Sequence, residues 1–147
     1  MAAVAVTMAT CVTGHAQTCA NPLPMPPDSP TWASTCGAQV FATNDLSGPG
    51  AVLSFTLDEA GSVYFTLSGT PGFEPQVCVT DMEGQCGTGP CLATGDASTP
   101  VLLDGLPVGS YRAIVTASSF SAPGSCGAFG IIENIAPGEA ILANGFD

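Results

Sequence analysis

The stretch Leu53-Ser54-Phe55-Thr56-Leu57 alternates apolar with hydroxyl-bearing side chains, and Val63-Tyr64-Phe65-Thr66-Leu67 repeats the pattern ten residues later. A period of two is typical of a β-strand with one face buried and the other exposed. The connection Asp58-Glu59-Ala60-Gly61 is short and contains a glycine, which favours a tight turn. The sequence therefore predicts a β-hairpin over residues 53–67.

Other segments of the chain are also typical of short strands. Five of them are separated by clusters of Gly, Pro, Asn and Asp: residues 38–43, 76–80, 99–103, 110–117 and 128–133. No segment longer than eight residues keeps a helical period without Gly or Pro, so almost no helix is expected. We predict an all-β fold, a two-layer antiparallel β-sandwich. Its expected core is Leu53, Phe55, Leu57, Val63, Phe65, Leu67, Val77, Val79, Val115, Phe129 and Ile131.

Composition excludes several classes of partner. The chain has 147 residues, enough for one domain with its own core, and 46% of them are hydrophobic. One Lys or Arg stands against twelve Asp and Glu, which gives a net charge of −11. Neutralising nucleic-acid phosphates requires several cationic side chains, and anionic membranes also attract basic segments. We therefore expect no nucleic-acid partner and no membrane insertion of the mature chain.

The N-terminal segment, residues 1–17, is uncharged, rich in Ala and Val, and reaches a small-residue step at Gly14-His15-Ala16. These features predict a secretory signal peptide, although the usual positively charged start is missing. A transmembrane helix is the alternative, but it needs about 20 mostly apolar residues, and threonines and His15 interrupt this run. The mature chain would then comprise a proline-rich strap (18–36), a sandwich domain (37–135) and a C-terminal tail (136–147).

The cysteines support cleavage of this leader. Of seven cysteines, Cys11 lies within it, and the remaining six are an even number, as expected for three disulfides formed in an oxidising compartment. We therefore predict a secreted, extracellular protein, with the periplasm and the cell surface as alternatives. Six cysteines allow fifteen pairings; we expect a Cys19–Cys36 bridge around the strap and a local bridge from Cys86 to either of its neighbours. The six are Cys19, Cys36, Cys78, Cys86, Cys91 and Cys126.

The two ends of the mature chain differ from the sandwich domain. Five of the ten residues from Asn21 to Pro30 are prolines, so this part of the strap must be extended and cannot enter a central strand. The chain ends in Gly145-Phe146-Asp147, for which a sorting signal and an unremarkable frayed terminus both remain open.

Two elements resemble the bacterial pre-peptidase C-terminal domain. One is residues 53–57 followed by Ala60-Gly61-Ser62-Val63-Tyr64-Phe65, and the other is Leu106-Pro107-Val108-Gly109-Ser110-Tyr111, which opens a late strand. The resemblance covers about residues 37–135. It implies a jelly-roll-like sandwich that serves as a noncatalytic accessory module of secreted hydrolases. Where many members have an acidic strand, this chain has Phe73-Glu74-Pro75-Gln76-Val77.

The predicted mature chain lacks the histidine and lysine side chains that most hydrolytic mechanisms use. The one histidine of the sequence, His15, lies in the leader, and there is no lysine, so a Ser-His-Asp site, a Schiff base and a phosphate-binding lysine are all excluded. A glycosidase needs only two carboxylates, but Asp58 and Glu59 are adjacent and would point to opposite sides of an extended chain. We therefore expect no enzyme activity and no organic cofactor, with a carboxylate-based hydrolase as a minor alternative.

Asp81 and Glu83 are the candidate metal ligands. They share a side of the chain in the loop after residue 80, and together with backbone carbonyls they could bind calcium, which prefers several oxygen ligands. Solvated loop carboxylates are the alternative, since no recognised calcium loop is present.

Binding by exposed aromatic side chains is the remaining chemistry. Tyr64 has the outward parity of its strand, Trp32 lies in the strap, and Phe73 lies in a loop. Core packing is the alternative for each of them, and Tyr111 is expected to pack in its turn with the hydroxyl bonded to backbone. Arg112, the one cation, is expected in an ion pair or at a binding site.

Taken together, these features predict a secreted, noncatalytic binding or accessory module for carbohydrate or another extracellular protein. A structural or adhesive subunit, in which the strap or the tail adds a strand to a neighbour's sheet, is the alternative.

Overall fold

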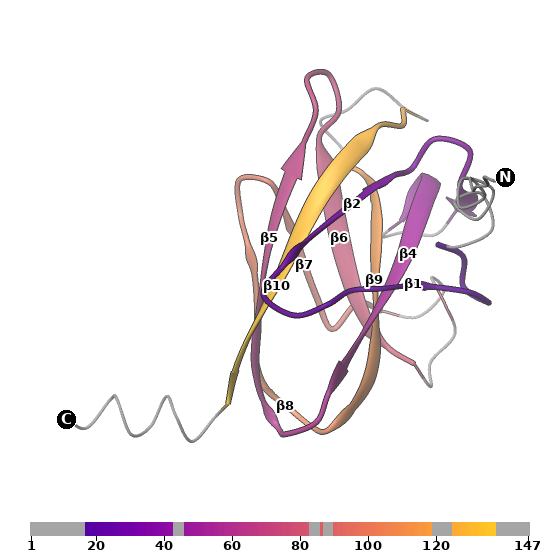
Figure 1. The fold of residues 1–147 in the computed structure, drawn as a ribbon. Helices are drawn as coiled ribbons and strands as arrows, with labels where there is room; N and C mark the ends of the chain where they lie inside the picture. Colours follow the sequence, from indigo (N-terminus) through magenta and orange to yellow (C-terminus); the bar gives the residue numbers. More distant parts are fainter. Residues whose placement is uncertain (1–16, 43–45, 83–85, 87–89, 119–124, 138–147) are drawn as a thin grey trace, which may run out of the picture.

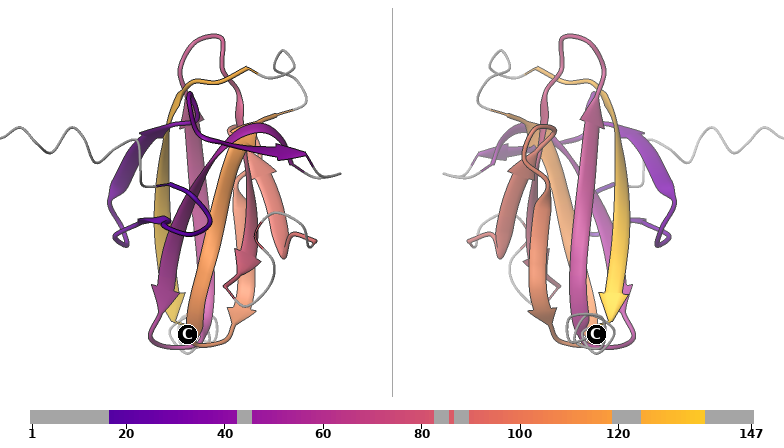
Figure 2. Two further views of the ribbon diagram at one scale, coloured as in Figure 1. Left: turned by 90° about the vertical axis from the view of Figure 1, so that its right-hand side faces the viewer. Right: turned by 90° about the vertical axis from the view of Figure 1, so that its left-hand side faces the viewer.

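The computed structural model describes residues 17–42, 46–82, 86, 90–118 and 125–137, and within them it contains strands and no helix. The strands form two sheets packed face to face (Figure 1, Figure 2), so the predicted all-β sandwich is confirmed. No helix in this part of the chain is available to cross a membrane. The strands are β1 (Leu23–Pro24), β2 (Pro30–Ser34), β3 (Gln39–Ala42), β4 (Ser47–Leu57), β5 (Gly61–Gly69), β6 (Pro75–Asp81), β7 (Ala93–Asp96), β8 (Val101–Leu106), β9 (Gly109–Ala117) and β10 (Ala128–Pro137).

The first sheet, sheet A, has the order β1-β4-β9-β6-β7, with β3 also paired to β4. The second, sheet B, has the order β2-β10-β5-β8. All pairs are antiparallel except β1 with β4. Every segment predicted as a strand overlaps an observed one. The sequence did not predict β1, β2 and β7, which are all short strands at sheet edges, where one-sided pairing imposes a weaker pattern.

The predicted hairpin over residues 53–67 is wrong, because its two strands belong to different sheets. β4 pairs with β9 in sheet A, whereas β5 pairs with β10 and β8 in sheet B. Residues 58–60 therefore cross from one layer to the other. An alternating pattern shows which face of a strand is buried, but it is the same whether the next strand is its neighbour in one sheet or lies in the facing sheet.

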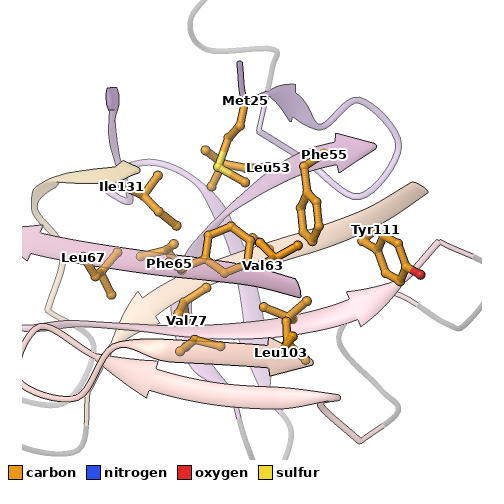
Figure 3. Close-up of a cluster of buried hydrophobic side chains, with 14 of the residues drawn as sticks. Met25, Leu53, Phe55, Val63, Phe65, Leu67, Val77, Leu103, Tyr111 and Ile131 are labelled. Atoms are coloured by element: carbon orange, nitrogen blue, oxygen red, sulfur yellow. The ribbon is translucent and has the colours of Figure 1, made fainter. Parts of the chain in front are cut away.

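The main core lies between the sheets, and all eleven predicted core residues are buried in it. The ring of Phe55 on β4 meets that of Phe65 on β5 edge to face with centroids 5.0 Å apart, and it stacks on Tyr111 of β9 at 5.3 Å (Figure 3). The Tyr111 hydroxyl donates to the carbonyl of Pro107, as expected for a packed turn tyrosine. The contact between Phe55 and Phe65 therefore joins the two layers.

Sheet A also buries its outer face, the face turned away from sheet B. Val52 of β4, Cys78 of β6 and Ile114 of β9 each lie between two residues of the main core, so their side chains project outward. There they pack with Phe41 and Leu46 in a second apolar cluster. Three further cysteines adjoin this cluster: Cys19, Cys86 and Cys91.

Three disulfides form, as predicted, but the predicted pairing is wrong. Cys36 bonds to Cys126, 90 residues away, because Cys36 follows β2 and Cys126 precedes β10, and these strands are neighbours in sheet B. The other two bridges cover the outer face of sheet A: Cys19–Cys86 and Cys78–Cys91.

We expect Phe65→Ala to lower the free energy of unfolding by about 3–5 kcal/mol, because it removes a fully buried ring and leaves a cavity between the layers. Thr66→Ala is the matched control on the exposed side of the same strand and should change stability by less than about 0.5 kcal/mol. Urea unfolding of the oxidised proteins measures both. Equal stabilities would contradict this assignment of the core.

Candidate binding face

The outer face of sheet B is the candidate site. Its side chains alternate with the core residues of the same four strands and point away from sheet A. Three of them are large and exposed: Trp32 of β2 by 69%, Tyr64 of β5 by 42% and Leu102 of β8 by 56%. Only three other large apolar side chains are exposed in the described residues, and they lie on separate segments: Val40, Leu92 and Val108. The exposed apolar surface of this part of the chain is therefore concentrated on sheet B.

Strand register places the two aromatic side chains at opposite ends of one strip. Trp32 pairs with Gly130 of β10, and Tyr64 pairs with Asn134 of the same strand. Two strand spacings across the sheet and four residues along β10 put them roughly 16 Å apart. Ile132 lies between them on β10. Thus the structure brings Trp32 and Tyr64 together on one face, as the binding hypothesis requires.

Gly130 allows the Trp32 ring to lie against the sheet. A Cβ atom at Gly130 would be 2.6 Å from Cζ3 of the indole, which is closer than carbon atoms can approach. The side chain is nevertheless exposed by 69%, so one face of the ring rests on the β10 backbone and the other faces solvent. The sequence analysis missed Gly130, because a glycine within a strand gains this meaning only when its neighbour is known.

The strip between the two aromatic rings is neutral and rich in hydrogen-bonding groups. Thr66 and Ser68 of β5 and Asn134 of β10 are exposed on this face, and none of the described residues between Trp32 and Tyr64 is charged there. On β8, Asp104 accepts a hydrogen bond of 2.9 Å from the Ser62 hydroxyl. The face therefore offers ring surfaces, hydroxyl groups and an amide to a ligand.

Two other predicted binding residues lie elsewhere. Phe73 is buried in the main core, and its ring lies so close to Gly127 that a Cβ there would be 2.6 Å from it. Of the two interpretations of Phe73, core packing is therefore the one observed, and Phe73 is not available as an exposed binding residue. Arg112 of β9 is half-buried on the outer face of sheet A, on the opposite side of the molecule from the aromatic strip.

The predicted acidic sites are placed only in part. Asp81 is exposed at the end of β6, whereas Glu83 lies outside the described residues, so the calcium site stays a prediction. Within the described ranges, no three His, Cys, Asp or Glu residues are grouped as metal ligands. Asp58 and Glu59 are exposed in the connection from β4 to β5, where they line a groove of about 400 Å³ beside the strap.

Known structures share this sandwich. The chain is similar to the pre-peptidase C-terminal domain of a collagenase from Bacillus anthracis, with 11% identity, a TM-score of 0.54, and coverage of 78% of this chain and 95% of that domain. The chain therefore shares the overall fold of this domain. The resemblance noted in the sequence is thus confirmed at the level of the fold.

A second similar structure is a periplasmic inhibitor of g-type lysozyme from Aeromonas hydrophila, with 15% identity and a TM-score of 0.55. The match covers 78% of this chain and 96% of the inhibitor. No protein-family model matches the sequence, and no curated protein matches it significantly.

We expect Gly130→Ala to displace the indole of Trp32, because the new methyl group would occupy the place of the ring. Trp32 is the only tryptophan in the chain, so intrinsic fluorescence reports on it alone. Emission and acrylamide quenching should change in Gly130→Ala and stay at wild-type values in Ser68→Ala, the control on the paired strand. Unchanged fluorescence in Gly130→Ala would contradict the contact.

Proposed function

We propose that this chain is a secreted, noncatalytic binding module whose outer face of sheet B holds an extended neutral polysaccharide. The main support for this proposal is the difference between the outer faces of the two sheets. Sheet A covers its outer face with an apolar cluster and two disulfides, whereas sheet B leaves Trp32, Tyr64 and Leu102 exposed on one surface. Clustered apolar side chains at a polar surface are typical of interaction sites.

The chemistry of the strip fits a sugar chain. The C–H faces of pyranose rings pack on flat aromatic side chains, and their hydroxyl groups exchange hydrogen bonds with hydroxyl and amide side chains such as Thr66 and Asn134. A ligand must extend over roughly 16 Å to touch both Trp32 and Tyr64, which favours a polymer over a monosaccharide. A neutral ligand also avoids repulsion by a chain with a net charge of −11.

The disulfides and the similar structures also support a secreted, noncatalytic binding module. Three disulfides are typical of proteins outside the cytosol. The two similar structures are the pre-peptidase C-terminal domain of a collagenase and a periplasmic inhibitor of g-type lysozyme, and both likenesses support a noncatalytic module outside the cytosol. The inhibitor makes a protein ligand the main alternative occupant of the face.

Strand addition through the strap is disfavoured as a means of assembly. The strap already supplies β1 to sheet A and β2 to sheet B of its own chain. It would have to leave both sheets in order to pair with a neighbour. The C-terminal tail, the other candidate strand, lies outside the described residues.

We expect Trp32→Ala and Tyr64→Ala each to weaken retention on insoluble polysaccharides by about five- to tenfold, corresponding to ~1–1.5 kcal/mol for one aromatic contact. Val108→Ala is the matched control, because Val108 is 62% exposed in the connection between β8 and β9, away from the strip. The assay compares pull-down isotherms on cellulose and chitin, two insoluble polysaccharides without acidic groups. Equal binding by all variants, or binding by none including the wild type, would reject the proposal.

A further inference from the structure

Glu133 is a carboxylic acid inside the sandwich. On β10 it follows Phe129 and Ile131 in the inward alternation, and its side chain is only 1% exposed. Its Oε2 atom is buried and has no hydrogen-bond partner among the described residues. A buried carboxylate oxygen without a hydrogen-bond partner is costly in the charged state, so burial shifts Glu133 toward its neutral form.

The strap passes directly over this acid. Residues 25–29, the crossing segment, connect β1 at the edge of sheet A to β2 at the edge of sheet B. The Met25 amide donates to the carbonyl of Ser54 at 2.8 Å, and the Asp28 amide donates to the carbonyl of Glu133 at 2.6 Å. The Met25 side chain enters the core beside Leu53 (Figure 3). The crossing segment thus closes the edge of the sandwich over Glu133.

Two disulfides keep the strap attached if the crossing segment lifts. Cys19 precedes β1 and is bonded to Cys86, and Cys36 follows β2 and is bonded to Cys126. The short β1 pair involves only two residues of β4. An opening of the crossing segment would therefore be local and reversible, because both ends are covalently fixed while the middle is held by the Met25 side chain and two backbone hydrogen bonds.

We propose that the crossing segment is a pH-sensitive latch, closed over neutral Glu133 and loosened when Glu133 ionises, and that it controls how firmly β2 holds Trp32. The second part rests on the proposed function, because Trp32 belongs to the binding face. The first part concerns the strap alone and does not require a ligand.

The surroundings of Glu133 determine the direction of the effect. Burial, and next the negative charge of Asp28, raise its pKa from 4.5 to about 7. Its neighbour on β5 is Phe65, and the core residues that β4 presents from sheet A are apolar. The single cation, Arg112, lies on the outer face of sheet A, so the sheet itself separates it from Glu133.

The pKa of Glu133 in the closed and open forms determines whether rising pH favours opening. With the latch closed, Glu133 stays protonated up to about pH 7, whereas in the open form it meets water and its pKa returns toward 4.5. The stability that the protonated acid gives to the closed form is complete below pH 4.5 and is lost as pH rises to 7. Raising the pH through this window therefore favours opening, and further alkalinity adds little.

The test is hydrogen exchange of the oxidised protein, followed by NMR at pH 5, 6, 7 and 8 and corrected for the intrinsic exchange rate. Hydrogen exchange at the Met25, Asp28 and Thr31 amides should reveal opening that is about tenfold or more frequent at pH 8 than at pH 5. Amides at the β6–β9 pair exchange only through larger openings and should stay much better protected than the strap at every pH. Trp32 fluorescence should titrate over the same range.

Three variants make the test specific. Glu133→Gln should abolish the pH dependence of opening. Asp28→Asn removes the negative charge near Glu133 and should move the transition to lower pH. Asn also tolerates the φ of 60° at position 28, so this variant keeps the strap backbone and the buried residue unchanged. Glu59→Gln, an exposed carboxylate beside the same groove, should behave as the wild type. A strap whose opening is independent of pH, or a pH response that persists in Glu133→Gln, would overturn the latch.

The latch and the binding function can fail separately. If the strap titrates and no polysaccharide binds at any pH, the latch stands and the proposed ligand is rejected. If Trp32→Ala abolishes binding but strap exchange does not respond to pH, the binding face stands and the latch is rejected.

Discussion

The contact between Phe55 and Phe65 joins the two sheets, but it can bury only one face of each. Sheet A contains strands that are apolar on both faces, since residues 51–53, 77–79 and 113–115 are continuous apolar runs. In sheet B, β5 instead alternates apolar with polar side chains. Both faces of sheet A must therefore be buried, whereas sheet B needs to bury only one face. The second cluster and its disulfides cover the outer face of sheet A, and the outer face of sheet B stays exposed.

The sequence shows which face of each strand is buried, but it does not show which other strand each one pairs with. Side-chain alternation identified the core, because a strand buries the same residues whichever neighbour it has. The hairpin failed for that reason: β4 and β5 point their apolar sides at each other across the core. The predicted disulfide pairing was wrong for the same reason. Cys36 and Cys126 are 90 residues apart in the sequence, and only the pairing of β2 with β10 brings them together. Continuous runs such as residues 113–115 were an available signal that sheet A is covered on both faces.

At the candidate binding face, too, some residues could be predicted from their own strand and others depend on which strands lie side by side. The exposure of Tyr64 follows from the alternation in its own strand, so the sequence was sufficient to predict it. Trp32 was a candidate, but the prolines around it concealed that residues 30–34 form an edge strand. Gly130 supports the indole from a strand almost a hundred residues away, so no local pattern could reveal it. Phe73 could not be assigned, because a loop aromatic is exposed or buried according to how the loop folds back.

Charge composition also constrains what this core can tolerate. A buried carboxylate is usually compensated by a nearby cation, but this chain has one Lys or Arg against twelve acids. That cation, Arg112, is held on the far side of sheet A from Glu133. The inward alternation of Phe129, Ile131 and Glu133 was visible in the sequence, and with the composition it already implied an acid that is buried without a cationic partner. Such an acid is accommodated by protonation, and protonation makes the edge of the sandwich that covers it sensitive to pH.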